Sequence, residues 1–286
     1  MKRFGIILGT FLLLLLVIVF LSTSLVERKT YFHEDYYKNT LARLDSIKTI
    51  TVTETDSIQA GFSKVSITPV LNSSEDHYPE GKFIRVPLSG YGGRKGKYAT
   101  GIHDSIFVKA AAIRVGTQTV VFVGADLLIM PPNVIDSVTL LLSEKGIHRD
   151  QVFYSATHTH SSLGAWGPGF VGEQFAGKEN INIEKWLTLK ISESVLSALA
   201  DLKPARVSTG NFGIGMYTRN RLIKKLGNKN NDFSYIALEQ VGRRKAIIGS
   251  YSAHATTLGE KNLEISADYP GYWQQKMETA FDYAIF

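Results

Sequence analysis

The sequence predicts an α/β fold, a mixed sheet with parallel strand-helix-strand units flanked by helices, preceded by one N-terminal transmembrane helix. Three observations lead to this prediction. The chain opens with two basic residues and a long uncharged run, and strand-like and helical segments alternate after it. Its 286 residues are 44% hydrophobic and 20% charged, which is typical of a globular protein rather than a disordered chain or a repeat array.

The N-terminal run is long enough to cross a bilayer. Lys2 and Arg3 precede an uncharged segment from Phe4 to Val26. We therefore expect residues 1–26 to be a signal anchor and transmembrane helix. Because basic flanks stay in the cytoplasm, the rest of a single-pass membrane protein would lie on the extracytoplasmic side. The alternative is a secreted protein, cleaved after its signal.

The next segment is charged and rich in tyrosine. Its apolar residues Leu41, Leu44 and Ile47 have helical spacing, so residues 27–57 are expected to form a juxtamembrane stalk. The main domain would then comprise residues 58–286, with a first strand in Gly61–Pro69 that proline stops.

The middle of the chain predicts a hairpin followed by a crossover. Ile106–Val115 and Thr119–Val123 are β-rich and separated by a short turn. A helix starts at Pro131-Pro132-Asn133 and stops at Gly146, and the strand Gln151–Tyr154 follows. A strand-helix-strand unit of this kind implies a parallel pair with a right-handed crossover.

The second half predicts further α/β elements. A helix is expected over Ile183–Leu202, and a last helix from near Gly271 into the C-terminus. Strands are expected at Ala205–Ser208, Tyr235–Leu238 and Ala246–Ser252. The Gly-rich turn Ser89–Arg94 lacks the strand-turn-helix context of a nucleotide-binding loop, so we expect no nucleotide site there.

Composition excludes several kinds of site. The chain has no cysteine, so disulfides, zinc ribbons and thiol nucleophiles are excluded, and a metal would be held by His, Asp, Glu, Tyr or water. The net charge of +6 is mild, and no recognition motif accompanies the basic clusters at Lys224-Lys225 and Arg243-Arg244-Lys245. We therefore expect no nucleic-acid partner.

Histidines at strand ends are the strongest candidates for chemistry. His158 and His160 are two residues apart after a strand, so on an extended backbone they share a face, as metal ligands or as a base. His254 ends another strand in the same way. Asp126 also follows a strand, and ligands gather beyond the carboxyl ends of strands in open α/β sheets. Arg221, in a loop, either binds an acidic group or is simply solvated.

A set of short motifs occurs in a particular order along the chain. They are Gly61–Pro69, Gly101-Ile102-His103, Ser155–Ser161, Asn220-Arg221, His254-Ala255-Thr256 and Asp268–Tyr272. In this order they resemble the motifs of the neutral/alkaline (non-lysosomal) ceramidases. The similarity extends from about Ile58 to Tyr272, and its most specific piece is Ala156-Thr157-His158-Thr159-His160-Ser161 with the Gly-Ile-His motif upstream.

The resemblance implies a zinc-dependent amidohydrolase that cleaves the N-acyl bond of ceramide to give sphingosine and a fatty acid. It implies zinc held by His103 and His160, with His158 as an alternative ligand or a group acting on the transition state. The expected catalytic residues are His158 and His254, and the expected substrate-binding residues are Arg221 and Asp126. An anchored chain suits a ceramide-like lipid substrate, which lies at the bilayer surface.

The family's later motifs are absent from these 286 residues. They are an Asp-(Ile/Val)-Ser-Pro-Asn block with a proposed active-site serine, and the Glu and Tyr that complete the zinc site. We therefore expect residues 58–286 to be an incomplete N-terminal domain, with those groups beyond Phe286. The alternatives are a non-catalytic lipid- or glycan-binding fragment of the same fold and a related hydrolase of another amide or ester.

Overall fold

The computed structural model describes residues 2–23, 30–46, 57–224, 227–242 and 244–286. The chain forms two units, residues 1–51 and residues 52–286. In the first unit, an 18-residue window of α1 (Lys2–Ser22) has a mean hydropathy of 3.1, so the helix is long and apolar enough to cross a membrane, as a signal sequence also would be. The exposed helix α2 (Asp35–Ser46) follows. Residues 24–29 and 47–56 lie outside the described residues. They include the end of the predicted anchor and parts of both ends of the predicted stalk.

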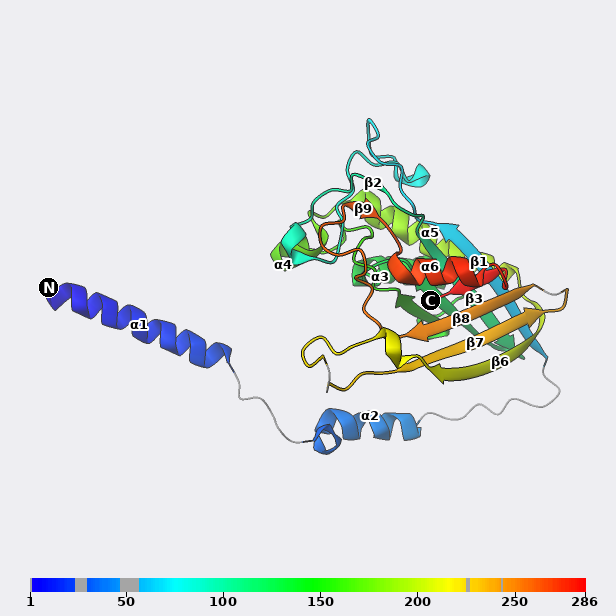
Figure 1. Ribbon diagram of the computed structural model, residues 1–286, viewed down its shortest axis with the longest axis horizontal. Coiled ribbons are helices and arrows are strands. Elements are labelled where there is room, and N and C mark those ends of the chain that lie inside the picture. The colour runs from blue at the N-terminus through cyan, green and yellow to red at the C-terminus, as the bar shows by residue number, and fades with distance from the viewer. Residues whose placement is uncertain (1, 24–29, 47–56, 225–226, 243) are drawn as a thin grey trace. The chain divides into compact units, whose positions relative to one another are not determined.

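The second unit is built on an eight-stranded mixed sheet, in the order β10-β8-β7-β6-β1-β3-β4-β5 (Figure 1). Its pairs are antiparallel except β4 with β5 and β8 with β10, which are parallel. The strands are β1 (Ile58–Ser66), β3 (Phe107–Val115), β4 (Gln118–Ala125), β5 (Val152–Ala156), β6 (Lys203–Gly213), β7 (Asp232–Gln240), β8 (Lys245–Tyr251) and β10 (Tyr283–Ile285). A separate parallel pair joins β2 (Gly101–Ile102) to β9 (Glu264–Ile265).

The predicted α/β fold is confirmed, including its hairpin and crossover. β3 and β4 pair antiparallel, with Val115 opposite Gln118. Helix α3 (Pro132–Ser143) then leads to β5, which lies parallel to β4. Local signals suffice here, because a short turn and a helix with proline at its start fix both connections.

One expectation about the C-terminus is wrong. Helix α6 (Asp268–Met277) ends nine residues before the chain does, and β10 follows it. This strand is three residues long and pairs with β8, so its formation depends on a distant partner rather than on its own sequence pattern.

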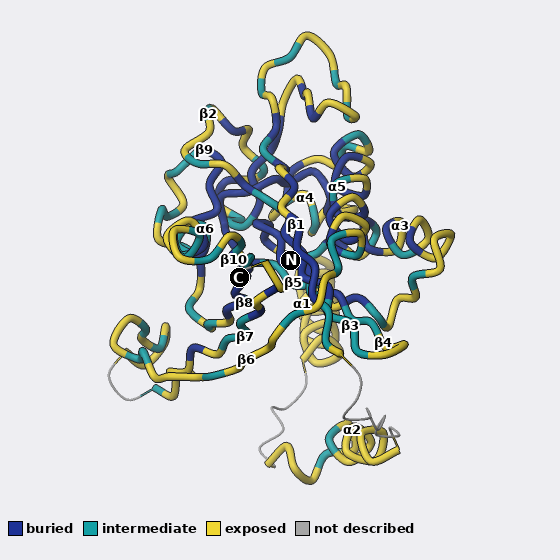
Figure 2. The backbone as a smooth tube through the Cα atoms, turned by 90° about the vertical axis from the view of Figure 1, so that its right-hand side faces the viewer, coloured by how far each residue is buried: buried dark blue, intermediate teal, exposed yellow. Residues whose placement is uncertain are grey.

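The main core lies between the sheet and the helices α3 and α5 (Ile181–Ala200). Figure 2 shows buried and exposed turns alternating along these two helices, as expected for amphipathic helices on a sheet. α5 comes very close to β1 at Gly61, where a Cβ atom would lie 2.1 Å from the carbonyl oxygen of Ala198. The short helix α4 (Gly169–Ala176) completes the unit.

The sheet rolls so that the edge strand β10 approaches β4, which lies next to the opposite edge strand β5. β10, at one edge, lies against Gly124 of β4, where a Cβ atom would be 2.7 Å from Ile285 Cγ2. A cavity of about 1000 Å³ lies between these strands and β6–β8. The candidate site opens onto this cavity.

Candidate functional site

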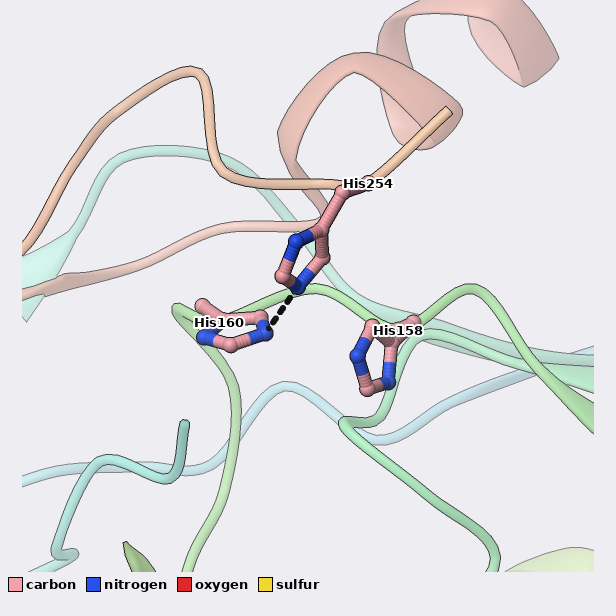
Figure 3. A group of neighbouring side chains, drawn as sticks. All are labelled: His158, His160 and His254. Carbon is pink, nitrogen blue, oxygen red and sulfur yellow. Dashed lines mark hydrogen bonds between the residues drawn. The ribbon is translucent and has the colours of Figure 1, made fainter. Parts of the chain in front are cut away.

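Three of the predicted site residues come together. His158 and His160 follow β5, His254 follows β8, and one ring nitrogen from each lies within 4.8 Å of the others. Figure 3 shows the three rings facing one another, with a hydrogen bond between His160 and His254. We call these residues the three-histidine group.

The backbone around His160 is fixed by long-range hydrogen bonds. Thr159 Oγ1 donates to the Ser266 carbonyl at 2.8 Å, and the His160 amide donates to the Ala255 carbonyl at 3.3 Å. His158 has a φ of +61°, in the left-handed region that residues with a Cβ atom rarely adopt. This conformation allows consecutive turn residues to reach both Ser266, which follows β9, and the segment after β8.

The tautomer of His158 follows from its partner. Its Nδ1 lies 2.6 Å from the Leu128 carbonyl oxygen, which only accepts, so Nδ1 carries the proton. Nε2 of the neutral ring is then left with its lone pair. A backbone carbonyl bonded to one nitrogen is the usual arrangement for a histidine that binds metal through the other.

His254 is held in the opposite tautomer by Arg221. The Arg221 guanidinium can only donate, and it donates to His254 Nδ1. The proton of neutral His254 is therefore on Nε2, which lies 2.8 Å from His160 Nε2 and donates to it. Burial, followed by the charge of Arg221, lowers the pKa of His254, which favours the neutral ring.

His160 is the most buried of the three. Burial, followed by the charges of His254, His158 and Arg94, lowers its pKa to about 4, so the ring is neutral near pH 7. Its Nε2 accepts from His254, which leaves the proton on Nδ1, and Nδ1 has no hydrogen-bond partner within the described part of the chain.

The Gly-rich turn Ser89–Arg94 forms a wall behind His160. Gly90 has a φ of +114°, and a Cβ atom there would lie 2.7 Å from the His160 ring. The ring of Tyr91 lies 4.8 Å from that of His160, and the guanidinium of Arg94 lies 4.7 Å from the Tyr91 ring. From the sequence we predicted only that this turn is no nucleotide-binding loop, and its contact with His160 was not predicted.

Arg94 is a buried cation whose hydrogen bonds all go to backbone carbonyls. It donates to Ser89 at 3.2 Å, Glu260 at 3.0 Å, Gly259 at 3.2 Å, and also to His160. The guanidinium thus joins the Gly-rich turn, the strand-end turn and the loop after His254. Sequence analysis missed this residue, because its partners lie 5 to 166 positions away.

Arg221 adjoins the three-histidine group through its bond to His254 and lines the first cavity, whereas the other two predicted residues lie elsewhere. His103 and Asp126 line a second cavity of about 770 Å³. His103 is exposed, and its Nδ1 lies 2.8 Å from Asp104 Oδ2. The structure therefore does not bring His103 into the three-histidine group.

Asp126 is a buried carboxylate with two fixed partners. It accepts from the Phe107 amide and from Gln274 Nε2, each at 2.9 Å. Burial raises its pKa to about 6, although the nearby Lys109 ammonium acts in the opposite direction. These bonds tie β3 and β4 to α6.

The three-histidine group has the donor chemistry of a zinc site. Nitrogen ligands of a tetrahedral zinc ion lie about 3.4 Å apart, and the group's separations, 2.8 Å for one pair and up to 4.8 Å overall, lie on either side of this value. Three imidazoles are also a common ligand set of catalytic zinc. The group can therefore hold a metal ion after small ring rotations.

Comparison with known proteins gives a consistent picture. The family model "Neutral/alkaline non-lysosomal ceramidase, N-terminal" matches residues 80–284. The fold is similar to that of neutral ceramidase from Pseudomonas aeruginosa, with a TM-score of 0.65, 21% identity, and coverage of 82% of this chain and 38% of that one. It is also similar to a structure described as a ceramidase complexed with C2, with a TM-score of 0.66, 22% identity, and coverage of 81% and 37%.

The chain thus spans a little over a third of the length of these two solved structures. No curated protein sequence matches it.

Proposed function

Because the chain belongs to the neutral/alkaline non-lysosomal ceramidase family, we propose that it hydrolyses the N-acyl amide bond of a ceramide-like lipid with the help of zinc. The single observation that carries the proposal beyond family membership is the three-histidine group at the mouth of a large cavity. Sphingosine and a fatty acid would be the products.

The proposed zinc ligands include His160 in every arrangement. One set is the three-histidine group, in which His158 offers the lone pair of Nε2 and His254 would have to give up its bond to Arg221. The other set is the predicted pair His103 and His160. Bound zinc would polarise the amide carbonyl and lower the pKa of a bound water.

In the second set, His254 stabilises the transition state by a hydrogen bond. Arg221 keeps the proton on His254 Nε2, the atom that faces the site, so this nitrogen can donate to the negative charge that develops on the amide oxygen. Arg221 retains further N–H groups that can bind a polar group of the substrate. Phe122, Phe153 and Ile248 in the cavity wall suit a hydrocarbon chain.

A membrane location suits this substrate. We propose that α1 anchors the chain as a single-pass protein with residues 52–286 on the extracytoplasmic side. Secretion after signal cleavage is the alternative, and the size of the chain in purified membranes separates the two.

The proposal is tested by metal analysis and by turnover of the full chain in detergent micelles. We expect about one zinc per chain, with hydrolysis of a fluorescent N-acylsphingosine. His160→Ala should lose both, whereas His148→Ala, which changes an exposed histidine outside the site, should lose neither. Loss of zinc from His103→Ala would favour the predicted pair, and loss from His254→Ala the three-histidine group.

Three results would contradict the proposal. They are the absence of zinc at neutral pH, lipid binding without turnover, and turnover only of other amides or esters. The second would indicate a non-catalytic lipid-binding protein, and the third a related hydrolase.

A further inference from the structure

A long loop projects from the sheet between β6 and β7. Figure 1 shows it in yellow beyond the carboxyl end of β6, and Figure 2 shows it mostly in the colour of exposed residues. We consider its first part, residues 215–224, and call this segment the basic-apolar loop. Its Arg221 contacts His254, so the loop borders the first cavity.

The apolar side chains of this loop point into solvent. Leu222 is 89% exposed, Met216 81% and Tyr217 77%, and the neighbouring Ile223 is also exposed. Single exposed apolar residues are common on protein surfaces, but four within eight positions form a patch that indicates an interaction site.

The exposure is maintained by a hydrogen-bonded turn. Asn220 Oδ1 accepts from the amides of Leu222 and Ile223, each at 2.9 Å. Across the loop, Lys229 Nζ donates to the Thr218 carbonyl at 2.9 Å and to the Gly215 carbonyl. The turn therefore holds the apolar side chains outward instead of letting them fold back onto the domain.

The charge of the loop indicates the chemistry of its partner. Between Ile214 and Asn231 the sequence holds five Lys or Arg residues and no Asp or Glu. In the basic-apolar loop, the exposed Arg219 and Lys224 flank the apolar side chains. Apolar residues interleaved with cations match a bilayer surface, where apolar groups enter the acyl boundary and cations contact anionic headgroups.

We propose that the basic-apolar loop docks residues 52–286 onto an anionic lipid surface. Met216, Tyr217, Leu222 and Ile223 enter the bilayer boundary, and Arg219 and Lys224 contact lipid phosphates. This contact places the mouth of the first cavity at the lipid surface. The inference concerns binding alone and stands whether or not the chain proves to be a hydrolase.

The absence of cysteine makes a direct depth measurement possible. Leu222→Cys in the full chain, labelled with an environment-sensitive fluorophore, is reconstituted in phosphatidylcholine vesicles with and without phosphatidylglycerol. The matched control is Val241→Cys, because Val241 is 73% exposed and follows β7 at the opposite end of the same strands. Both proteins carry α1, so membrane attachment by that helix is common to them.

With phosphatidylglycerol present, the label at position 222 should shift its emission to the blue, and lipid-borne quenchers should place it about 5–10 Å into the boundary. The label at position 241 should stay in water. Lys224→Glu should reduce the response at 222, whereas Lys145→Glu, which changes an exposed lysine after α3, should leave it unchanged. Equal quenching at 222 and 241, or a response at 222 that does not require phosphatidylglycerol, would overturn the proposal.

Discussion

Removing the Arg94 guanidinium should destabilise residues 52–286 more than removing any exposed arginine. Arg94 is fully buried and donates to the carbonyls of Ser89, His160, Gly259 and Glu260. Arg94→Met would leave these acceptors without their donor in a water-poor site. A buried acceptor left without a donor costs about 1–3 kcal/mol, so losing the donor to these carbonyls together should lower the free energy of unfolding by roughly 3–5 kcal/mol. For a domain of this size, that loss corresponds to a fall in Tm of roughly 6–20 °C.

The assay is thermal unfolding of the full chain in detergent, followed by near-UV circular dichroism. The control is Arg85→Met, because Arg85 is exposed and lies 5.2 Å from the ring of Tyr98, a contact like that of Arg94 with Tyr91. Arg94→Lys should recover little of the lost thermal stability, because an ammonium cannot reproduce the planar fork of donors of a guanidinium. If Arg94→Met and Arg85→Met unfold within a few degrees of each other, the reasoning is refuted.

Three further predictions use matched variants or a change of pH, each measured by urea unfolding. Gly90→Ala should lower the free energy of unfolding by about 1–3 kcal/mol more than Gly242→Ala does. Both glycines have a positive φ, but only Gly90 faces a side chain, the ring of His160. Equal losses from the two substitutions would contradict this prediction. Leu187→Ala, in the core, should cost about 2–5 kcal/mol, whereas Leu189→Ala, on the exposed side of the same helix, should cost far less. The pKa of Asp126 is about 6, against 3.8 ordinarily, so the folded state holds this proton more tightly. Relative to Asp126→Asn, the wild type should therefore gain roughly 1 kcal/mol of stability as the pH falls from 7 to 5, and a difference that stays constant with pH would contradict this.

The parts of the fold that the sequence predicted are those that local signals determine. The β3–β4 hairpin has a short turn, and α3 begins at prolines and ends before Gly146. β10 was missed because three residues carry no recognisable period, and their pairing is with a strand more than thirty positions earlier.

The candidate site was predicted in the same uneven way. The spacing of His158 and His160 pointed to a shared site, and His254 was noted because it also ends a strand. The direct bond between His254 and His160 depends on tertiary structure, as does the position of His103 beside Asp104 in another cavity. Arg94 carried no signal, since a buried cation bonded to carbonyls needs no acidic residue nearby in the sequence.

The rolling of the sheet explains why two strand ends so far apart in the chain form one site. β5 pairs with β4 and β8 pairs with β10, so the meeting of His160 with His254 requires β4 and β10 to approach each other. Gly124 permits this approach, because any side chain there would collide with Ile285 and with the carbonyl of Phe286. A Gly124→Val variant should therefore move His160 and His254 apart, while the helices α3 and α5 that pack on the sheet stay formed. The site thus depends on a glycine near the end of β4, a position that carries none of its chemistry.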